Sequence, residues 1–404
     1  MSKIISRPVR HRQSSIPLLP SLYRQTSTST PLRRQNRLPA SYYRGGTSRA
    51  IIFSASSLPS NHTLWPPIFL SILGSPDPHG RQLDGLGGGI SSLSKICIVG
   101  PSPHPAADVD YTFAAIGIRD SEVDFSSNCG NMTSAIGPFA VDNGMVDVGD
   151  GESDVTVRIR NTNTGKFIHA RFAVVNGEAA AGGGFEIDGV VGKGGKVQLS
   201  FIDPAGSKTG KLLPTGNVVD VFDGVRATCI DAGNPCVFVQ AEDMDIEGMI
   251  LPDEIDASLP LLSKLDSIRR KAAVAMGLCQ DEASAPGSIP KIAMVSRPKT
   301  HTLLSGETIE QEKVDLVVRA LSVGQPHRAV PITVAMAIAA AANLEGSTVQ
   351  GKVSSERVDP DGITLGHPSG KLMVGAKFDE KGHLLQADVF RTARRLMDGL
   401  VYWK

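Results

Sequence analysis

A partial internal repeat constrains this chain more than any other feature. The strand-like segment Lys95–Pro101 has a counterpart in Lys291–Pro298, because both begin Lys-Ile and both carry Val at the fifth position. An apolar helix-like segment follows each, after Cys129 in the first half and over Ala329–Asn343 in the second. Since 404 residues are too many for one small core, we expect two similar halves, each built around an apolar helix.

The leading candidate site is the start of the first of these helices. Asp124–Phe139 predicts a strand end, a tight Asn-Cys-Gly-Asn turn and then a helix, with Asn131 or Thr133 as the N-cap. Free N–H groups and a partial positive charge at a helix start suit a carboxylate or phosphate, here at Gly130, Asn131 and Met132. The same position favours a thiolate, so Cys129 is either a reactive thiol or a small apolar residue packed under the cap.

The repeat also predicts a second helix start. Cys129 lies 34 positions after Lys95, and 34 positions after Lys291 is Gln325; Asn131 is matched in the same way by His327. Residues 324–328 are therefore expected to begin the second helix and to face the first. Two positive helix ends that converge would hold a di- or tricarboxylate.

Two glycine-rich loops supply further candidate ligands. In Arg44–Arg49, paired glycines allow a close backbone approach, and Arg44, Thr47 and Ser48 can bind carboxylates; a simple hairpin with surface arginines is the alternative. The loop 82–95 lacks P-loop spacing but can form an anion nest with Ser92 and Ser94. Lys95 ends this loop, either as a buried lysine that can carry a proton or as a strand-end lysine that reaches solvent.

Two later segments complete the predicted elements. Asp231–Pro235 is a tight bend that presents the side chain of Asn234. Helices are predicted over Trp65–Leu73, Leu259–Met276 and Val389–Met397.

Composition limits the classes of function. The formal net charge is 0, so charge gives no reason to expect nucleic acid or an anionic membrane as a partner, and no apolar run is long enough to span a bilayer. The 42 glycines and 5% aromatic residues favour a strand-rich protein. Neither the five scattered cysteines nor the histidines have a spacing typical of metal ligands. The cysteines indicate no disulfide framework, which fits a reducing compartment.

The N-terminal residues 1–38 differ from the rest of the chain. They contain seven arginines, many Ser and Thr, and no Asp or Glu, a composition typical of a mitochondrial transit peptide, although four prolines interrupt any long helix. The segment is either such a peptide, which would direct the protein to the mitochondrial matrix, or a disordered basic tail on a cytoplasmic protein.

Several motifs together resemble the PrpF family of 2-methylaconitate cis-trans isomerases, within the diaminopimelate epimerase-like fold. They are Arg-Gly-Gly-Thr-Ser-Arg at 44–49, Asp-Gly-Leu-Gly-Gly-Gly at 84–89, Cys-Gly-Asn-Met at 129–132, Asp-Pro-Ala-Gly-Ser at 203–207, Leu-Pro-Thr-Gly-Asn at 213–217 and Asp-Ala-Gly-Asn-Pro at 231–235. The resemblance runs from about residue 39 to near the C-terminus.

The resemblance implies an α+β fold of two similar domains, each a curled, mostly antiparallel sheet wrapped around a central helix, with the active site in the cleft between them. We expect these domains at 39–205 and 206–385, with a C-terminal helix at 386–404 that packs back on the first. The family's general base and its partner thiol fall on Lys95 and Cys129, and catalysis is implied to need no metal, flavin or pyridoxal phosphate.

The implied activity is cis-trans isomerisation or a double-bond shift in an unsaturated tricarboxylic acid, such as aconitate or 2-methylaconitate. An oxalomesaconate-type tautomerase would use the same residues. Amino-acid epimerisation is disfavoured, because Gln325 or His327 stands where racemases of this fold have a second cysteine. A carboxylate-binding protein without activity is the alternative from a different class.

Overall fold

Short β-branched and apolar segments separated by glycine turns form most of the regular structure, in keeping with the composition. The structure is a computed structural model, which describes residues 34–126, 128–149 and 151–404. The predicted targeting segment lies almost wholly outside the described residues, and the first strand already begins at Asn36. Among the described residues, none of the helices has the length and apolar content to cross a bilayer.

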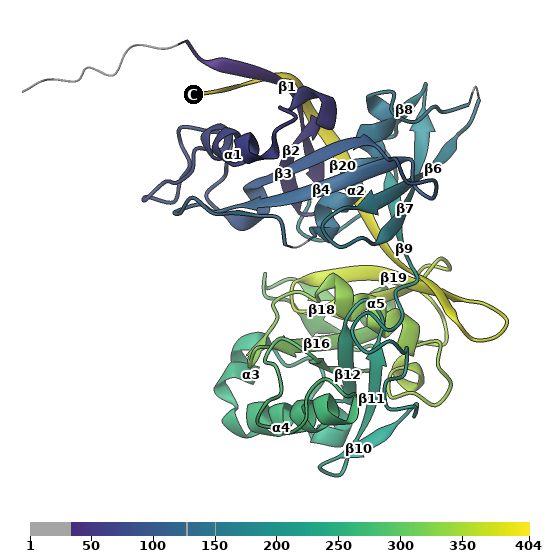
Figure 1. The fold of residues 1–404 in the computed structure, drawn as a ribbon. Coiled ribbons are helices and arrows are strands. Elements are labelled where there is room, and N and C mark those ends of the chain that lie inside the picture. The colour runs from purple at the N-terminus through teal and green to yellow at the C-terminus, as the bar shows by residue number, and fades with distance from the viewer. Residues whose placement is uncertain (1–33, 127, 150) are drawn as a thin grey trace, which may run out of the picture. The chain divides into compact units, whose positions relative to one another are not determined.

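The first half of the chain contributes nine strands and two helices (Figure 1). The strands are β1 (Asn36–Gly45), β2 (Ser48–Ser54), β3 (Lys95–Pro101), β4 (Val109–Ile116), β5 (Val123–Asp124), β6 (Asp154–Asn161), β7 (Phe167–Val175), β8 (Glu178–Ala179) and β9 (Lys196–Ile202). The helices are α1 (Trp65–Leu73) and α2 (Gly130–Asp142).

The second half contributes the remaining elements. The strands are β10 (Asp220–Phe222), β11 (Val225–Asp231), β12 (Pro235–Gln240), β13 (Lys291–Ser296), β14 (His301–Thr302), β15 (Thr308–Ile309), β16 (Leu316–Ser322), β17 (Gln325–Pro326), β18 (Ile363–His367), β19 (Gly370–Phe378) and β20 (Leu384–Trp403). The helices are α3 (Pro252–Ala257), α4 (Leu259–Ala275) and α5 (Ile332–Ala341), so the helices predicted at Trp65 and Leu259 are confirmed.

Most strand pairings are antiparallel, and the same order of pairings occurs in both halves. In the first half, hairpin β1–β2 is followed by parallel β2–β3, antiparallel β3–β4, parallel β4–β6 and hairpin β6–β7. In the second, hairpin β11–β12 is followed by parallel β12–β13, antiparallel β13–β16, parallel β16–β18 and hairpin β18–β19. The sequence repeat therefore corresponds to a repeated topology.

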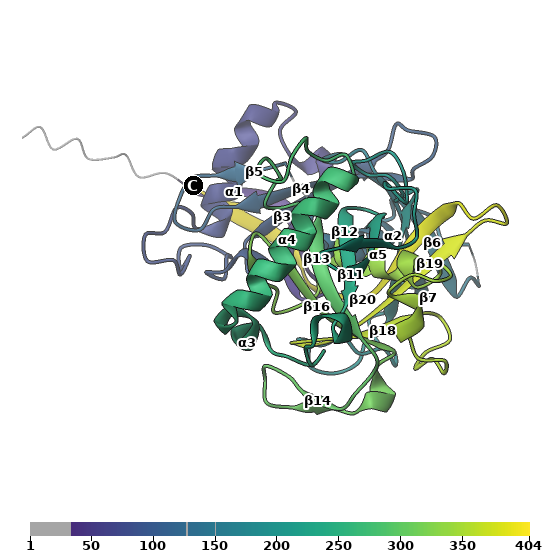
Figure 2. The same ribbon diagram turned by 90° about the horizontal axis from the view of Figure 1, so that it is seen from below.

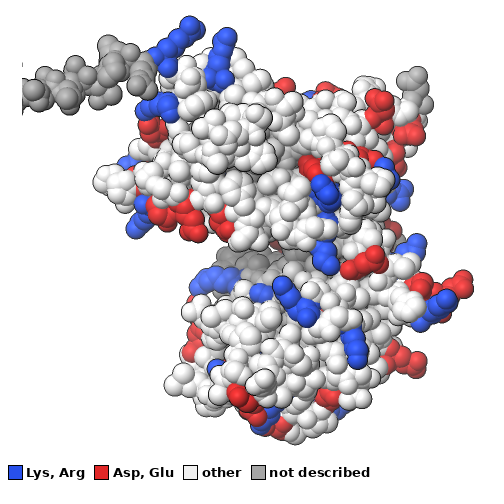
Figure 3. Space-filling model, viewed as in Figure 1, with Lys and Arg blue, Asp and Glu red and all other residues white. Residues whose placement is uncertain are grey.

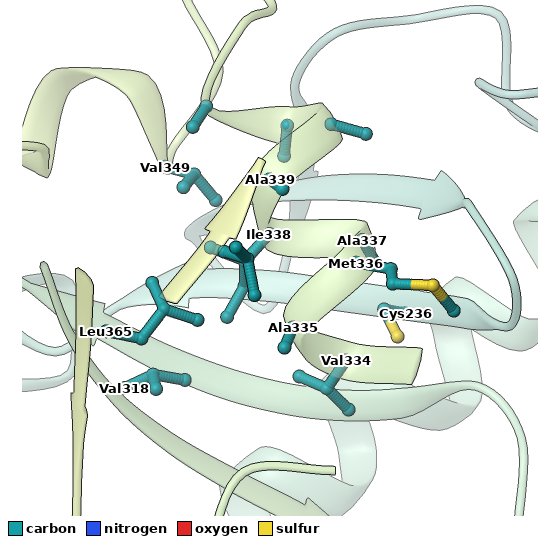
Figure 4. Packing of buried hydrophobic residues seen from close by; sticks show 14 of the residues in the cluster. Cys236, Val318, Val334, Ala335, Met336, Ala337, Ile338, Ala339, Val349 and Leu365 are labelled. Carbon is teal, nitrogen blue, oxygen red and sulfur yellow. The ribbon is translucent and has the colours of Figure 1, made fainter. Parts of the chain in front are cut away.

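Each half has a core around one apolar helix. All residues of α2 from Met132 to Val141 are buried, and those of α5 from Val334 to Ala341 are buried too. Figure 4 shows α5 residues packed against Cys236, Val318, Val349 and Leu365 from the surrounding strands and loop. A helix that is apolar on every side must be enclosed, which explains why the strands curl around it. The amphipathic helices α1 and α4 cover the outer faces of the sheets, and α4 lies across β11–β13 in Figure 2.

The predicted C-terminal helix at 386–404 is wrong, because these residues belong to the long strand β20 (yellow in Figure 1). Residues 384–389 of β20 pair with β19, 386–392 with β9 and 393–403 with β1, so the segment does pack on the first half, but as a strand. Its helix-like arginine spacing is overridden by hydrogen bonding to these neighbours and by burial of Ala387 and Val389 in the core of the second half.

The predicted helix starts are also corrected. The N-cap of α2 is Cys129 rather than Asn131 or Thr133, since Gly130 is already helical. Helix α5 begins at Ile332 after Pro331, not at 324–328, where Gln325 and Pro326 form the short strand β17. The match by fixed spacing fails because the second half has additional residues between its strand and its helix.

Asp231 accepts several hydrogen bonds from the segment that joins the two halves, so we expect its loss to destabilise the fold. Its buried carboxylate accepts hydrogen bonds from the Ser207 hydroxyl at 2.6 Å, the Lys208 N–H at 2.8 Å, and the Thr209 N–H and hydroxyl at 2.9 Å each. Replacing Asp231 with alanine is expected to destabilise the fold by about 3 kcal/mol, because buried donors lose their acceptor. Urea unfolding measures this loss, and an equal effect of Asp256→Ala, at an exposed position on α3, would contradict it.

Candidate active site

Lys95 is the first residue of β3, and its side chain faces the core around α2. Side chains alternate along a strand, and Cys97 and Val99 belong to the α2 core, whereas Ile96 and Ile98 pack with α1. Lys95 has the parity of Cys97 and is only 8% exposed. Its Nζ lies 5.1 Å from the centre of the Phe113 ring, and no carboxylate of the described residues pairs with it. The expected buried lysine is therefore present, and the solvent-facing alternative is excluded.

Cys129 occupies the N-cap of α2, with the N–H groups of the first helical turn directed past it. The residue is half-buried and packs against the α2 core. The Cys129 carbonyl accepts hydrogen bonds from the Thr133 N–H and hydroxyl, both at 3.0 Å, which hold the turn closed. A thiol at this position is next to the positive end of the helix.

Cys97 lies within electrostatic reach of both groups. Burial raises the pKa of the Cys97 thiol, Cys129 adds to the rise, and the Lys95 ammonium opposes it. Lys95 thus lies on the same side of β3 as Cys97, which belongs to the α2 core against which Cys129 packs.

The starts of α2 and α5 meet. A Cβ built on Gly130 would lie 2.5 Å from Cδ1 of Ile332, so the first residues of the two helices are in contact. A cavity of about 600 Å³ lies beside it, lined from the first half by Asn128, Gly130 and Lys166 and from the second by Lys208 and Thr333, among others. The expected convergence of two helix ends is therefore present, although the second end is not the one predicted.

The β1–β2 hairpin presses against the first turn of α2. A Cβ on Gly45 would lie 2.6 Å from the Asn131 carbonyl oxygen, and Gly46, at φ +53°, would meet the Asn131 side chain. The Asn131 amide donates to the Thr47 hydroxyl at 3.1 Å, while Ser48 is buried. The glycine pair thus allows a close approach of the hairpin to α2, whereas the prediction was a close approach to a ligand, and it brings Thr47 to Asn131.

Arg391 is a site residue that the sequence reasoning missed. Its Nε donates to the Asn131 Oδ1 at 3.2 Å, and its Nη1 donates to the Phe390 carbonyl at 3.0 Å. Burial lowers the pKa of Arg391 to about 10. The prediction of a helix over Val389–Met397 gave no reason to single out Arg391. A strand prediction would have placed Arg391 opposite the inward-facing residues of β9 and so drawn attention to it.

Other predicted ligands are held within loops. The Arg44 Nη1 donates to the Gly46 carbonyl, the Thr392 carbonyl and the Thr392 hydroxyl at 2.9–3.0 Å, bracing the hairpin against β20. The Ser94 hydroxyl lies 2.7 Å from the Oε1 of Gln82, a buried side chain around which the glycine-rich loop folds. Ser92 is half-buried, and the Met132 side chain lies in the core, so only its backbone can reach a ligand.

Among the described residues, no contact joins Asn234 or His327 to Lys95 or Cys129. The Asn234 amide donates to the Pro235 carbonyl at 3.4 Å, next to Gly233 in the wall of the cavity. The His327 Nε2 lies 2.7 Å from the Ser322 hydroxyl, and burial, with the charge of Lys291, lowers its pKa. His327 is therefore near Lys291, the lysine of the second half that corresponds to Lys95.

Comparison with known proteins finds relatives that match nearly the whole chain. The family model described as PrpF protein matches residues 35–404. The chain is 40% identical to a 3-methylitaconate isomerase of Eubacterium barkeri and to a 2-methyl-aconitate isomerase of Shewanella oneidensis, covering 91% of this chain and 97% of each relative. A crystal structure of methylitaconate-delta-isomerase superposes with a TM-score of 0.83 at 39% identity, covering 91% of this chain and 96% of that one.

Similarity at this level over nearly the whole length of both chains makes this protein an isomerase. It belongs to the PrpF family.

Proposed function

We propose that the protein isomerises an unsaturated di- or tricarboxylic acid of the aconitate or methylaconitate type by allylic proton transfer, without a cofactor. The observation that carries this proposal is a buried Lys95 without a carboxylate partner among the described residues, on the side of β3 that faces the α2 core against which the N-cap residue Cys129 packs. The names of the two relatives at 40% identity support the substrate class.

In the proposed mechanism, the Lys95 amine removes a proton from the carbon next to the double bond. The negative charge spreads into a carboxyl group as a dienolate, and the N–H groups at the start of α2 stabilise it because they are fixed before reaction. Cys129, on the other side of the substrate, returns a proton or steadies the intermediate. Rotation before reprotonation gives cis-trans isomerisation, whereas reprotonation at the far carbon shifts the double bond.

Substrate binding is assigned to groups at the same helix start. Thr47, Ser48 and the backbone of Gly130, Asn131 and Met132 would bind one carboxylate. Arg44, Ser92, Ser94, Asn234 and His327 are the remaining predicted ligands, and we propose no contact with the substrate for them. We infer that these halves act as two domains, 39–205 and 206–385, with the substrate held in the cleft between them.

An absorbance assay on a substrate panel tests the proposal. The purified protein is expected to interconvert cis-aconitate and trans-aconitate, or their 2-methyl derivatives. Activity on oxalomesaconate alone would instead assign the tautomerase, which uses the same two side chains. No change in any of these acids, with a protein that unfolds cooperatively on heating, would contradict the proposal.

A further inference from the structure

Half-buried Arg391 differs from the fully buried Arg319 in what its guanidinium contacts. Arg319 is 1% exposed, and its three guanidinium nitrogens donate to the carbonyls of Ile250, Val318 and Met249 at 2.6–3.0 Å. That guanidinium is closed off by backbone acceptors and has a structural role. In Arg391, only Nε and Nη1 have a partner among the described residues, and Nη2 has none.

The charge of Arg391 has no compensating acid. Burial alone lowers its pKa, and no carboxylate of the described residues pairs with it. The acceptor of its Nε is the neutral amide oxygen of Asn131, in the first turn of α2. A guanidinium and a helix N-terminus therefore stand together, both positive, in a place where an unpaired charge is costly. An anion bound here would relieve that cost.

We propose that Arg391 binds the second carboxylate of the substrate and so selects di- and tricarboxylates over monocarboxylates. Asn131 holds the guanidinium in position, and Nη2 forms the open side of the carboxylate site. This inference rests on the proposed function for the identity of the substrate, but its binding step can be measured without turnover.

The test uses calorimetric titration with tricarballylate, a saturated tricarboxylate that has no allylic proton to lose. Arg391→Met is expected to weaken binding about 100-fold, because a desolvated charge partner is lost. Arg391→Lys is expected to weaken it about tenfold, since lysine keeps the charge but loses the planar fork. Arg394→Gln is the matched control: it lies on the same strand, is exposed, and should bind as the wild type does.

The outcomes separate the two proposals. Binding by Arg391→Met within threefold of the wild type overturns the inference, as does a wild-type protein that does not bind tricarballylate. If Arg391→Met fails to fold, Arg391→Lys decides, and wild-type affinity in that variant is the contrary result. A wild-type protein that binds tricarballylate but isomerises no unsaturated acid would contradict the proposed function and leave the carboxylate site standing.

Discussion

Replacing Lys95 with alanine is expected to lower kcat about 10² to 10⁴-fold and to abolish solvent deuterium incorporation into the substrate. The reason is that Lys95 is the proposed base, buried on the face of β3 that meets α2, with no carboxylate partner among the described residues. Proton NMR of the substrate in deuterium oxide follows both exchange and isomerisation in one sample.

The second half supplies the control for this variant. Lys291 begins β13 as Lys95 begins β3, and it is also partly buried. Lys291→Ala is expected to keep its activity within about threefold of the wild type, because a base is needed only at the substrate carbon. Exchange by Lys95→Ala at the wild-type rate, in a protein with an unchanged unfolding midpoint, would refute the assignment of the base.

Replacing Cys129 with alanine is expected to cost about 10²-fold or more in kcat while affinity for a saturated tricarboxylate stays close to that of the wild type. The thiol is the proposed proton donor, whereas carboxylate binding relies on backbone N–H groups of α2 that alanine leaves in place. Single-turnover kinetics together with titration by tricarballylate separate the two effects.

A thiol reagent gives an independent measurement of the same residue. Iodoacetamide is expected to inactivate the wild type through Cys129, because this half-buried thiol lies at the proposed site. Cys279 is the control thiol, since it is also half-buried but does not precede a helix. Cys279→Ala should be inactivated at the wild-type rate. Wild-type turnover by Cys129→Ala would remove the thiol from the mechanism.

Features that depend on residues adjacent in the sequence could be predicted. Glycine at 45 and 46, the cysteine before an apolar helix, and the lysine at a strand start each have a local physical meaning, and each lies where it was expected. The repeat likewise predicted two halves with one enclosed helix each, since apolar residues on every side of a helix demand burial.

Features set by distant parts of the chain were not predictable in the same way. Residues 384–403 have arginines at helical spacing, but three partner strands from different parts of the chain make them a strand. That error concealed Arg391, whose contact with Asn131 spans 260 positions. The start of α5 was misplaced because spacing within one half cannot reveal extra residues in the other.

Charge patterning is uninformative about the site. Acidic and basic side chains are mixed over the face in Figure 3, in line with a formal net charge of 0. The features that point to an anionic substrate are instead partly buried and local: a helix start, and a lysine and an arginine that have no carboxylate partner among the described residues. The contact of the arginine with the helix start emerges only when strands far apart in sequence are assembled.

The most direct test is a crystal structure of the protein with bound tricarballylate. We expect the acid to lie at the start of α2, with the Lys95 amine and the Cys129 sulfur on opposite sides of its carbon chain. Density for the acid on another surface, with Lys95 and Cys129 both out of contact with it, would contradict the proposed chemistry.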